Sequence, residues 1–164
     1  TKVTLDVGKT YQLRLSNAPG KVTWKSVNSS IVSVSSSGKI KAKKSGKISV
    51  RATCQGKSYK CTVTVLPAKQ KLSYAKSRKA GSVTLKWKKD KAAKGYQISY
   101  STDKRFRKSV KNIWVKNISS YSRTLTGLKK GKTYYFRVRS YGTWKNARLY
   151  GDYSSTVKVT VRRK

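Results

Sequence analysis

The sequence predicts an all-β fold built from two tandem β-sandwiches of about seven strands each. Three observations lead to this prediction. Apolar and polar residues alternate with a period of two in nearly every segment, clusters of Gly, Asn and Ser separate the segments at short intervals, and no stretch has the pattern of an amphipathic helix. The chain of 164 residues is long enough for two small sandwiches, each with a thin core.

Strands are expected where the alternation is clearest. Val83, Leu85 and Trp87 alternate with polar residues, which places the apolar side chains inward and the polar ones outward. The predicted strands lie near 2–5, 11–15, 21–25, 31–34, 38–43, 47–54 and 58–66 in the first half, and near 71–75, 82–88, 95–101, 110–116, 121–126, 133–141 and 154–162 in the second.

Pro67 separates the two sets of strands. Proline cannot donate a hydrogen bond to a sheet, so strand pairing is expected to stop there. The sequence therefore predicts one domain over 1–66, a short linker over 67–71 and a second domain over 72–164.

Charge is the dominant feature of the composition. Lys and Arg total 41 against four acids, which gives a formal net charge of +37. Residues 1–66 hold 13 basic residues and one acid, whereas residues 67–164 hold 28 and three. Such a field attracts polyanions, and we expect the attraction to be stronger in the second domain.

The residue types that are missing exclude several kinds of site. The chain has no His, so neither a Ser–His–Asp nor a Cys–His site can form. Its two Cys cannot complete a zinc site without further ligands, and no loop is rich in oxygen ligands for calcium. We expect no catalytic residue, no cofactor and no metal. No apolar run is long enough to insert into a membrane.

Cys54 and Cys61 flank the turn-like stretch QGKS, which reads as a hairpin. A register that pairs residue 54 with residue 61 would place both sulfurs on one face, and we predict a disulfide between them, hence an oxidising compartment. The alternative is two reduced, partly buried thiols.

The first half resembles the bacterial immunoglobulin-like group 2 family. The matching stretches are LDVGKTYQL (5–13), VTWKSVNSSIVSVSSSGKIKAKKSGKISVRAT (22–53) and CTVTV (61–65). The resemblance implies an immunoglobulin-like sandwich in which Trp24 fills the space between the sheets. Gly38 and Gly46 are expected at turns that a Cβ atom would obstruct.

The second half is similar to a fibronectin type III domain through VTLKWKK, GYQISYS, LTGLKKGKTYYFRVRSY and YGDYSSTVKVTV. The resemblance implies a core position for Trp87 and a tyrosine corner, in which the Tyr134 hydroxyl bonds a nearby backbone group. Lys130 stands where the family usually has a proline, and no Arg-Gly-Asp tripeptide is present.

This pair of modules is similar to the C-terminal regions of surface proteins of Gram-positive bacteria, which implies adhesion, spacing or wall association. The chain begins at Thr1 and shows no signal peptide. We therefore expect a monomeric piece of a longer, secreted polypeptide, located at the cell surface or cell wall and joined to upstream domains.

Two segments of the second half are candidate polyanion-binding sites. In DKRFRK, the cations Lys104, Arg105, Arg107 and Lys108 surround Phe106, a pattern suited to sulfate or phosphate. The alternative is a solvated hairpin tip with Phe106 packed on the sheet.

The second candidate is a long loop expected over 142–152, which carries Trp144, Lys145, Arg148 and Tyr150. An exposed Trp beside cations could stack on a sugar or a base. The alternative is that Leu149 and Tyr150 close the end of the core while Trp144 packs on a neighbour.

These features leave three functions open. The first is a module that anchors a larger protein to anionic cell-wall polymer or acidic glycan. The second is a structural spacer that positions an upstream catalytic or adhesive domain. The third is nucleic-acid binding, for which we expect only nonspecific binding in vitro because no reading motif is present.

Overall fold

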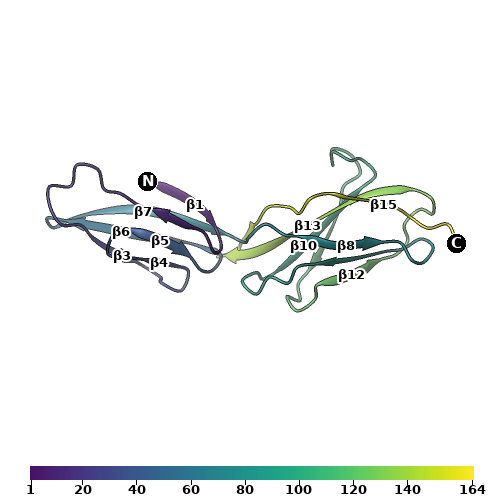
Figure 1. Ribbon diagram of the computed structural model, residues 1–164, viewed down its shortest axis with the longest axis horizontal. Coiled ribbons are helices and arrows are strands. Elements are labelled where there is room, and N and C mark those ends of the chain that lie inside the picture. The colour runs from purple at the N-terminus through teal and green to yellow at the C-terminus, as the bar shows by residue number, and fades with distance from the viewer. The chain divides into compact units, whose positions relative to one another are not determined.

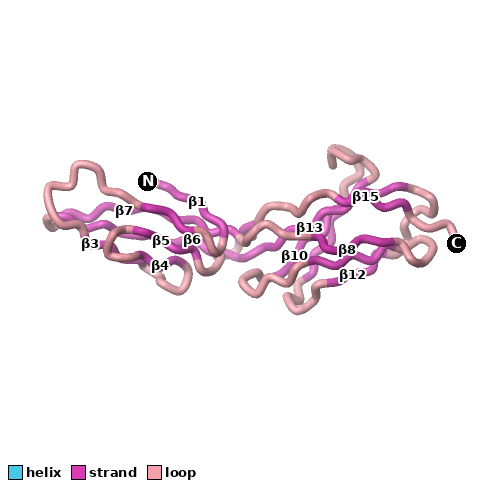
Figure 2. The backbone as a smooth tube through the Cα atoms, viewed as in Figure 1, coloured by secondary structure: helices cyan, strands magenta, loops and turns pink.

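The computed structural model describes residues 1–164 and consists of strands and turns without a helix (Figure 1, Figure 2). Two compact units are present. One comprises Thr1–Ala68 with Gly142–Tyr150, and the other comprises Lys69–Tyr141 with Gly151–Lys164. Each unit has its own hydrophobic core. The all-β fold predicted from the sequence is confirmed.

The first unit contains a four-stranded and a three-stranded sheet. Its strands are β1 (Lys2–Asp6), β2 (Thr10–Gln12), β3 (Thr23–Ser26), β4 (Val32–Val34), β5 (Lys39–Ala42), β6 (Gly46–Cys54) and β7 (Lys57–Leu66). The strand order is β1-β7-β6-β3 in the larger sheet and β2-β5-β4 in the smaller one. β1 runs parallel to β7, whereas the other pairs are antiparallel.

Trp24 packs against the buried core of this unit, as the resemblance implied. Its ring lies beside Gly38, which has a φ of 85° in the turn before β5. A Cβ atom at this position would lie 2.8 Å from both the Leu13 carbonyl oxygen and the Trp24 ring. Glycine is therefore required there both by the backbone conformation and by the space available.

The remaining strands are β8 (Leu72–Lys76), β9 (Val83–Trp87), β10 (Gly95–Ser101), β11 (Lys111–Val115), β12 (Ser122–Leu125), β13 (Thr133–Trp144), β14 (Ala147–Tyr150) and β15 (Val157–Thr160). They form the second unit, except that β14 and the end of β13 (142–144) belong to the first. One sheet has the order β11-β10-β13-β14, with β15 also paired to β13, and the other has the order β12-β9-β8.

Trp87 is 2% exposed in the core of the second unit, and its ring centroid lies 5.3 Å from that of Tyr96. The Tyr134 hydroxyl accepts a hydrogen bond from the backbone N–H of Lys129 at 3.3 Å. This is the tyrosine corner that the resemblance implied, and it fastens the turn before β13 to the strand.

Candidate functional site

The basic connection between β10 and β11 is held in place by the Asp103 carboxylate. One carboxylate oxygen accepts a hydrogen bond from the backbone N–H of Arg105 at 2.9 Å, and the other accepts one from the N–H of Arg107 at 2.8 Å. The Ser101 hydroxyl donates to the Lys108 carbonyl at 2.6 Å and closes the base of the loop. The segment therefore has a defined conformation.

The same contacts lower the pKa of the Asp103 carboxyl below its ordinary value, chiefly through the N–H groups of Arg105 and Arg107. The Arg107 side chain contributes less. Its Nε lies 3.9 Å from the carboxylate and the side chain is 68% exposed, so solvent screens this ion pair.

Phe106 anchors the loop from the other side. Its ring lies on the guanidinium of Arg137 on β13, with the Arg137 Cζ 3.9 Å from the ring centroid. Tyr153 contacts the same guanidinium at 3.9 Å, so Arg137 lies within 4 Å of the centroids of two aromatic rings. Phe106 thus packs against the sheet, as the structural alternative expected, and such contacts contribute about 0.5 to 2 kcal/mol each.

Four exposed cations project from this anchored loop: Lys104, Arg105, Arg107 and Lys108. Because the backbone is already fixed, a ligand would not have to order it, and less entropy would be lost on binding. The loop can present ammonium groups and planar guanidinium forks to sulfate or phosphate. Binding by these residues stays a prediction.

A second group of cations, which the sequence analysis missed, lies around a cavity of about 340 Å³ in the same unit. Its basic lining residues are Lys111, Lys129 and Lys132, and its hydroxyl-bearing residues include Thr102, Ser109 and Thr126. The tyrosine corner could have pointed to this group in the sequence. It fixes the backbone of the turn that carries Lys129 and Lys132.

The segment expected as a long loop over 142–152 is instead mostly strand. β13 continues to Trp144 and β14 begins at Ala147, so only a tight turn joins them. Lys145 adopts a φ of 51° in this turn. Strand pairing therefore extends beyond the segment that alternation alone predicted.

The structure separates the candidate residues into groups. Trp144, half-buried, and Lys145, exposed, line a cavity in the first unit. Arg148 and Tyr150 lie on β14 and are exposed and half-buried, respectively. The four cations of the β10–β11 loop belong to the second unit.

The predicted disulfide is wrong: Cys54 and Cys61 are both free and buried. A two-residue turn joins β6 to β7, in which Gln55 and Gly56 have φ of 45° and 74°. This turn pairs Cys54 with Lys57 and Cys61 with Val50. The two cysteines are thus four residues apart along the strands, about 13 Å, which is too far for a disulfide.

Burial raises the pKa of the Cys61 thiol, which lowers the fraction present as reactive thiolate. No group of three or more His, Cys, Asp or Glu side chains is placed to hold a metal ion. The structure also has no long apolar helix of the kind that crosses a membrane.

Comparison with known families agrees with this architecture. Residues 1–65 match the bacterial Ig-like domain (group 2), and residues 67–160 match the fibronectin type III domain. A Kelch domain-containing protein of Saccharolobus solfataricus is 40% identical over 79 residues, which cover 48% of this chain and 10% of that protein. The chain thus corresponds to a small part of that relative.

One solved structure has the same fold over nearly all of this chain. The FN1–FN3 domains of chicken CNTN1 superpose with a TM-score of 0.52 at 17% identity, covering 96% of this chain and 65% of that chain. The FN5 domain of Drosophila Lar gives a TM-score of 0.48 at 21% identity, covering 59% and 98%. At these identities the likeness concerns the fold alone.

Domains of these two kinds are typically non-catalytic and typical of extracellular or surface proteins. The resemblances deduced from the sequence are confirmed in their stated order. The chain is a bacterial Ig-like group 2 domain followed by a fibronectin type III domain, and it belongs to the fibronectin type III family over more than half of its length.

Proposed function

We propose that this chain is a non-catalytic anchoring module of a larger secreted protein. Its basic surface would hold that protein at the cell surface by binding anionic polymers, either wall teichoic acid or acidic glycans. One observation carries the proposal: if each of the four acids paired with one cation, 37 basic side chains would still lack an acidic partner. Anionic polymers supply the missing countercharge in a repeating form.

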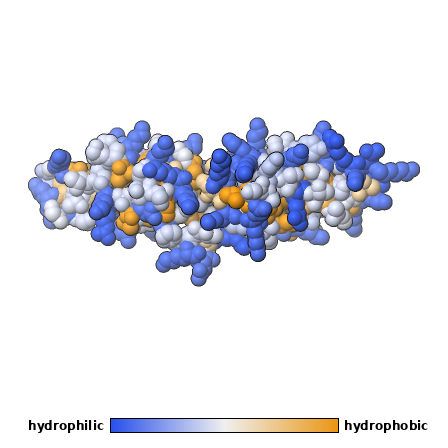
Figure 3. Space-filling model, turned by 90° about the horizontal axis from the view of Figure 1, so that it is seen from below, coloured by the Kyte–Doolittle hydropathy of each residue, from blue (hydrophilic) through white to orange (hydrophobic).

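The distribution of polar side chains supports a broad attachment surface. Hydrophilic side chains project over much of the surface of each unit, with small apolar areas between them (Figure 3). Within the second unit, the four cations of the β10–β11 loop are the best defined local site, because Asp103 and Phe106 hold their backbone.

The test is binding to purified wall teichoic acid and to heparin over a series of salt concentrations. Because binding releases counterions, we expect affinity to fall by about a hundredfold or more between about 50 and 200 mM salt. Binding that persists at high salt, or that is absent at low salt, would contradict the proposal.

A matched pair of variants locates the site within the second unit. The loop variant replaces Lys104, Arg105, Arg107 and Lys108 with Gln. The control replaces the exposed Lys88, Lys89, Lys91 and Lys94 with Gln, which removes the same charge from the β9–β10 connection. We expect the loop variant to lose about tenfold in affinity and the control less than about threefold.

A structural spacer is the competing function, and one observation favours it. Arg137 and Arg139 stack on aromatic rings of their own unit, and Arg139 also donates to Gln97 at 2.7 Å. These cations stabilise the fold regardless of any ligand. A spacer predicts equal retention of wild type and a charge-neutralised variant on cells, whereas an anchor predicts loss of the variant.

A further inference from the structure

One face of the four-stranded sheet in the first unit is strongly basic. Along β6, buried residues alternate with Lys47, Ser49 and Arg51, which point to the opposite face from the core. The same alternation holds for the neighbouring strands. We call this surface the cationic face and define it by Lys2, Lys25, Lys47, Ser49, Arg51, Lys60 and Thr62.

A row of three cations crosses this face. Lys60 on β7 lies opposite Arg51 on β6, and Arg51 lies opposite Lys25 on β3. All three side chains are exposed. Like charges placed directly opposite each other in neighbouring strands destabilise a sheet. The row therefore carries repulsion that a bound anion would relieve.

No acid of this unit is placed to neutralise the row. Asp6 is the single acid in Thr1–Ala68 and Gly142–Tyr150. It lies opposite Leu66, whereas Lys2 at the other end of the same strand lies opposite Thr62. The acid is thus about 13 Å along β1 from Lys2, on the side away from the row.

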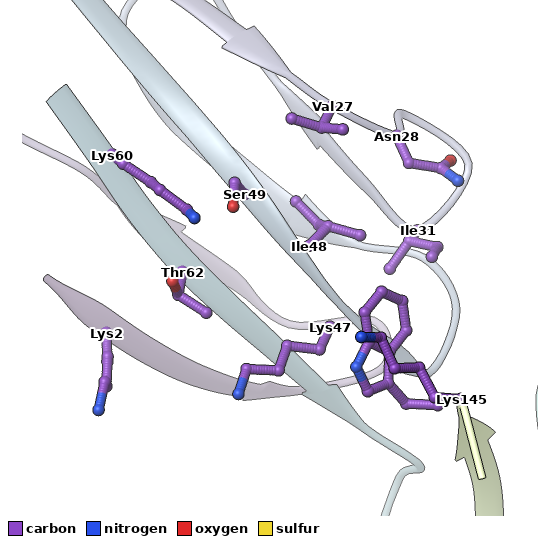
Figure 4. A pocket seen from close by; sticks show the side chains of 11 residues that line it. Lys2, Val27, Asn28, Ile31, Lys47, Ile48, Ser49, Lys60, Thr62 and Lys145 are labelled. Carbon is purple, nitrogen blue, oxygen red and sulfur yellow. The ribbon is translucent and has the colours of Figure 1, made fainter. Parts of the chain in front are cut away.

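Beside the row, the face forms an open hollow with a volume of about 610 Å³. Ser49 and Thr62 lie directly opposite each other and form its half-buried hydroxyl floor. Lys2, Lys47 and Lys60 surround these two hydroxyls from three adjacent strands (Figure 4).

The remaining wall of the hollow is partly apolar. It includes the half-buried Trp144. Ile31, the exposed Val27 and the exposed Lys145 also belong to it (Figure 4). An indole ring next to hydroxyl and ammonium groups offers a sugar ring both a stacking surface and polar partners.

We infer that the cationic face is a second polymer-binding site, which takes a linear sugar or polyol polymer carrying phosphate or sulfate esters. The ester oxygens would accept hydrogen bonds from the lysines and Arg51, and the hydroxyls of the polymer would bond Ser49 and Thr62. The open shape suits a chain lying along the sheet rather than an enclosed small molecule. This inference rests on the proposed attachment to anionic polymers and names a site for it.

The test compares two triple variants of the full chain. The face variant replaces Lys47, Arg51 and Lys60 with Gln. The control replaces Lys39, Lys41 and Lys43 with Gln, which removes the same charge from the exposed side of β5 and the residue after it. The probes are heparin for sulfate esters, poly(glycerol phosphate) for phosphate esters, neutral dextran and duplex DNA. Thermal unfolding checks that both variants remain folded.

We expect the face variant to bind heparin, poly(glycerol phosphate) or both about tenfold more weakly, with a shallower salt dependence, and the control to lose less than about threefold. The polymer that shows the loss identifies the ester. Equal losses in the two variants, or a loss seen only with DNA, would overturn the inference and leave the proposed function standing. If wild type bound neither charged polymer, the proposed function would fail as well.

Discussion

The β10–β11 loop and the cationic face of the first unit both gather cations, but they are built differently. The loop owes its shape to particular contacts, because Asp103 accepts from two backbone N–H groups and Phe106 packs on Arg137. The face owes its arrangement to regular strand pairing, which sets Lys60, Arg51 and Lys25 in one row.

Two surfaces that gather cations can therefore differ in how easily a substitution disrupts their arrangement. The loop can be disordered by one substitution while its unit stays folded, since its anchors lie at the surface. The face can be lost only by removing its cations or by unfolding its sheet. Substitutions that leave the cations untouched should therefore weaken binding through the loop, but should leave binding through the face unchanged as long as its sheet stays folded.

The largest effect is expected for Gly38→Ala, which acts on the unit that carries the face. Its φ of 85° and the 2.8 Å approach of a Cβ atom to the Trp24 ring leave no room for a side chain. We expect the first unit to lose about 2 to 3 kcal/mol of unfolding free energy. Denaturant unfolding followed by tryptophan fluorescence measures it, and unchanged stability would show that the turn tolerates a side chain.

Phe106→Ala should come next and should act on the loop. Loss of the ring from Arg137 is expected to destabilise the second unit by about 1 to 2 kcal/mol. Heparin affinity should also fall a few-fold although no charge is removed. Phe106→Tyr keeps the ring and serves as the control. If both variants bound heparin like wild type, the ring would not be positioning the loop.

Asp103→Asn separates loop geometry from charge. The substitution raises the net charge, so charge counting alone predicts tighter binding of heparin. We expect binding about threefold weaker, because an amide replaces an oxygen acceptor that holds the loop. Asp6→Asn makes the same charge change in the first unit and should not weaken binding. Tighter binding by the Asp103 variant would show that charge outweighs loop geometry.

Acid should also distinguish the two surfaces. The folded loop lowers the pKa of Asp103, so its contribution to stability is fully present above the unfolded value of about 3.9 and is lost as pH falls through the folded pKa. Sulfate esters stay ionised in this range. Dextran sulfate, which carries no carboxylate, should therefore bind more weakly through the loop on acidification, while its binding through the face should not change. The loop and face variants, titrated in parallel, measure each contribution.

The sequence predicted which residues share a face, because side chains alternate along a strand whatever its partner. It did not predict which residues lie opposite each other. That depends on turn length, and a two-residue turn at Gln55 and Gly56 was read as the longer QGKS stretch. The predicted disulfide needed residue 54 to pair with residue 61, whereas the two-residue turn pairs Cys54 with Lys57 and sets Lys60 opposite Arg51.

The β13–β14 hairpin was missed for a related reason. The stretch GTWKNARLY has little apolar alternation, so its strand character comes from pairing rather than pattern. The β10–β11 loop was easier to find, since its cations are adjacent in sequence. The contact that anchors Phe106 was less visible, because Arg137 lies far along the chain from it.

Retention on isolated Gram-positive cell walls, before and after chemical removal of teichoic acid, tests the central claim most directly. We predict that the chain is held by intact walls, is released as salt rises above about 200 mM, and is lost from stripped walls at every salt concentration. Equal retention on intact and stripped walls would contradict attachment through wall teichoic acid.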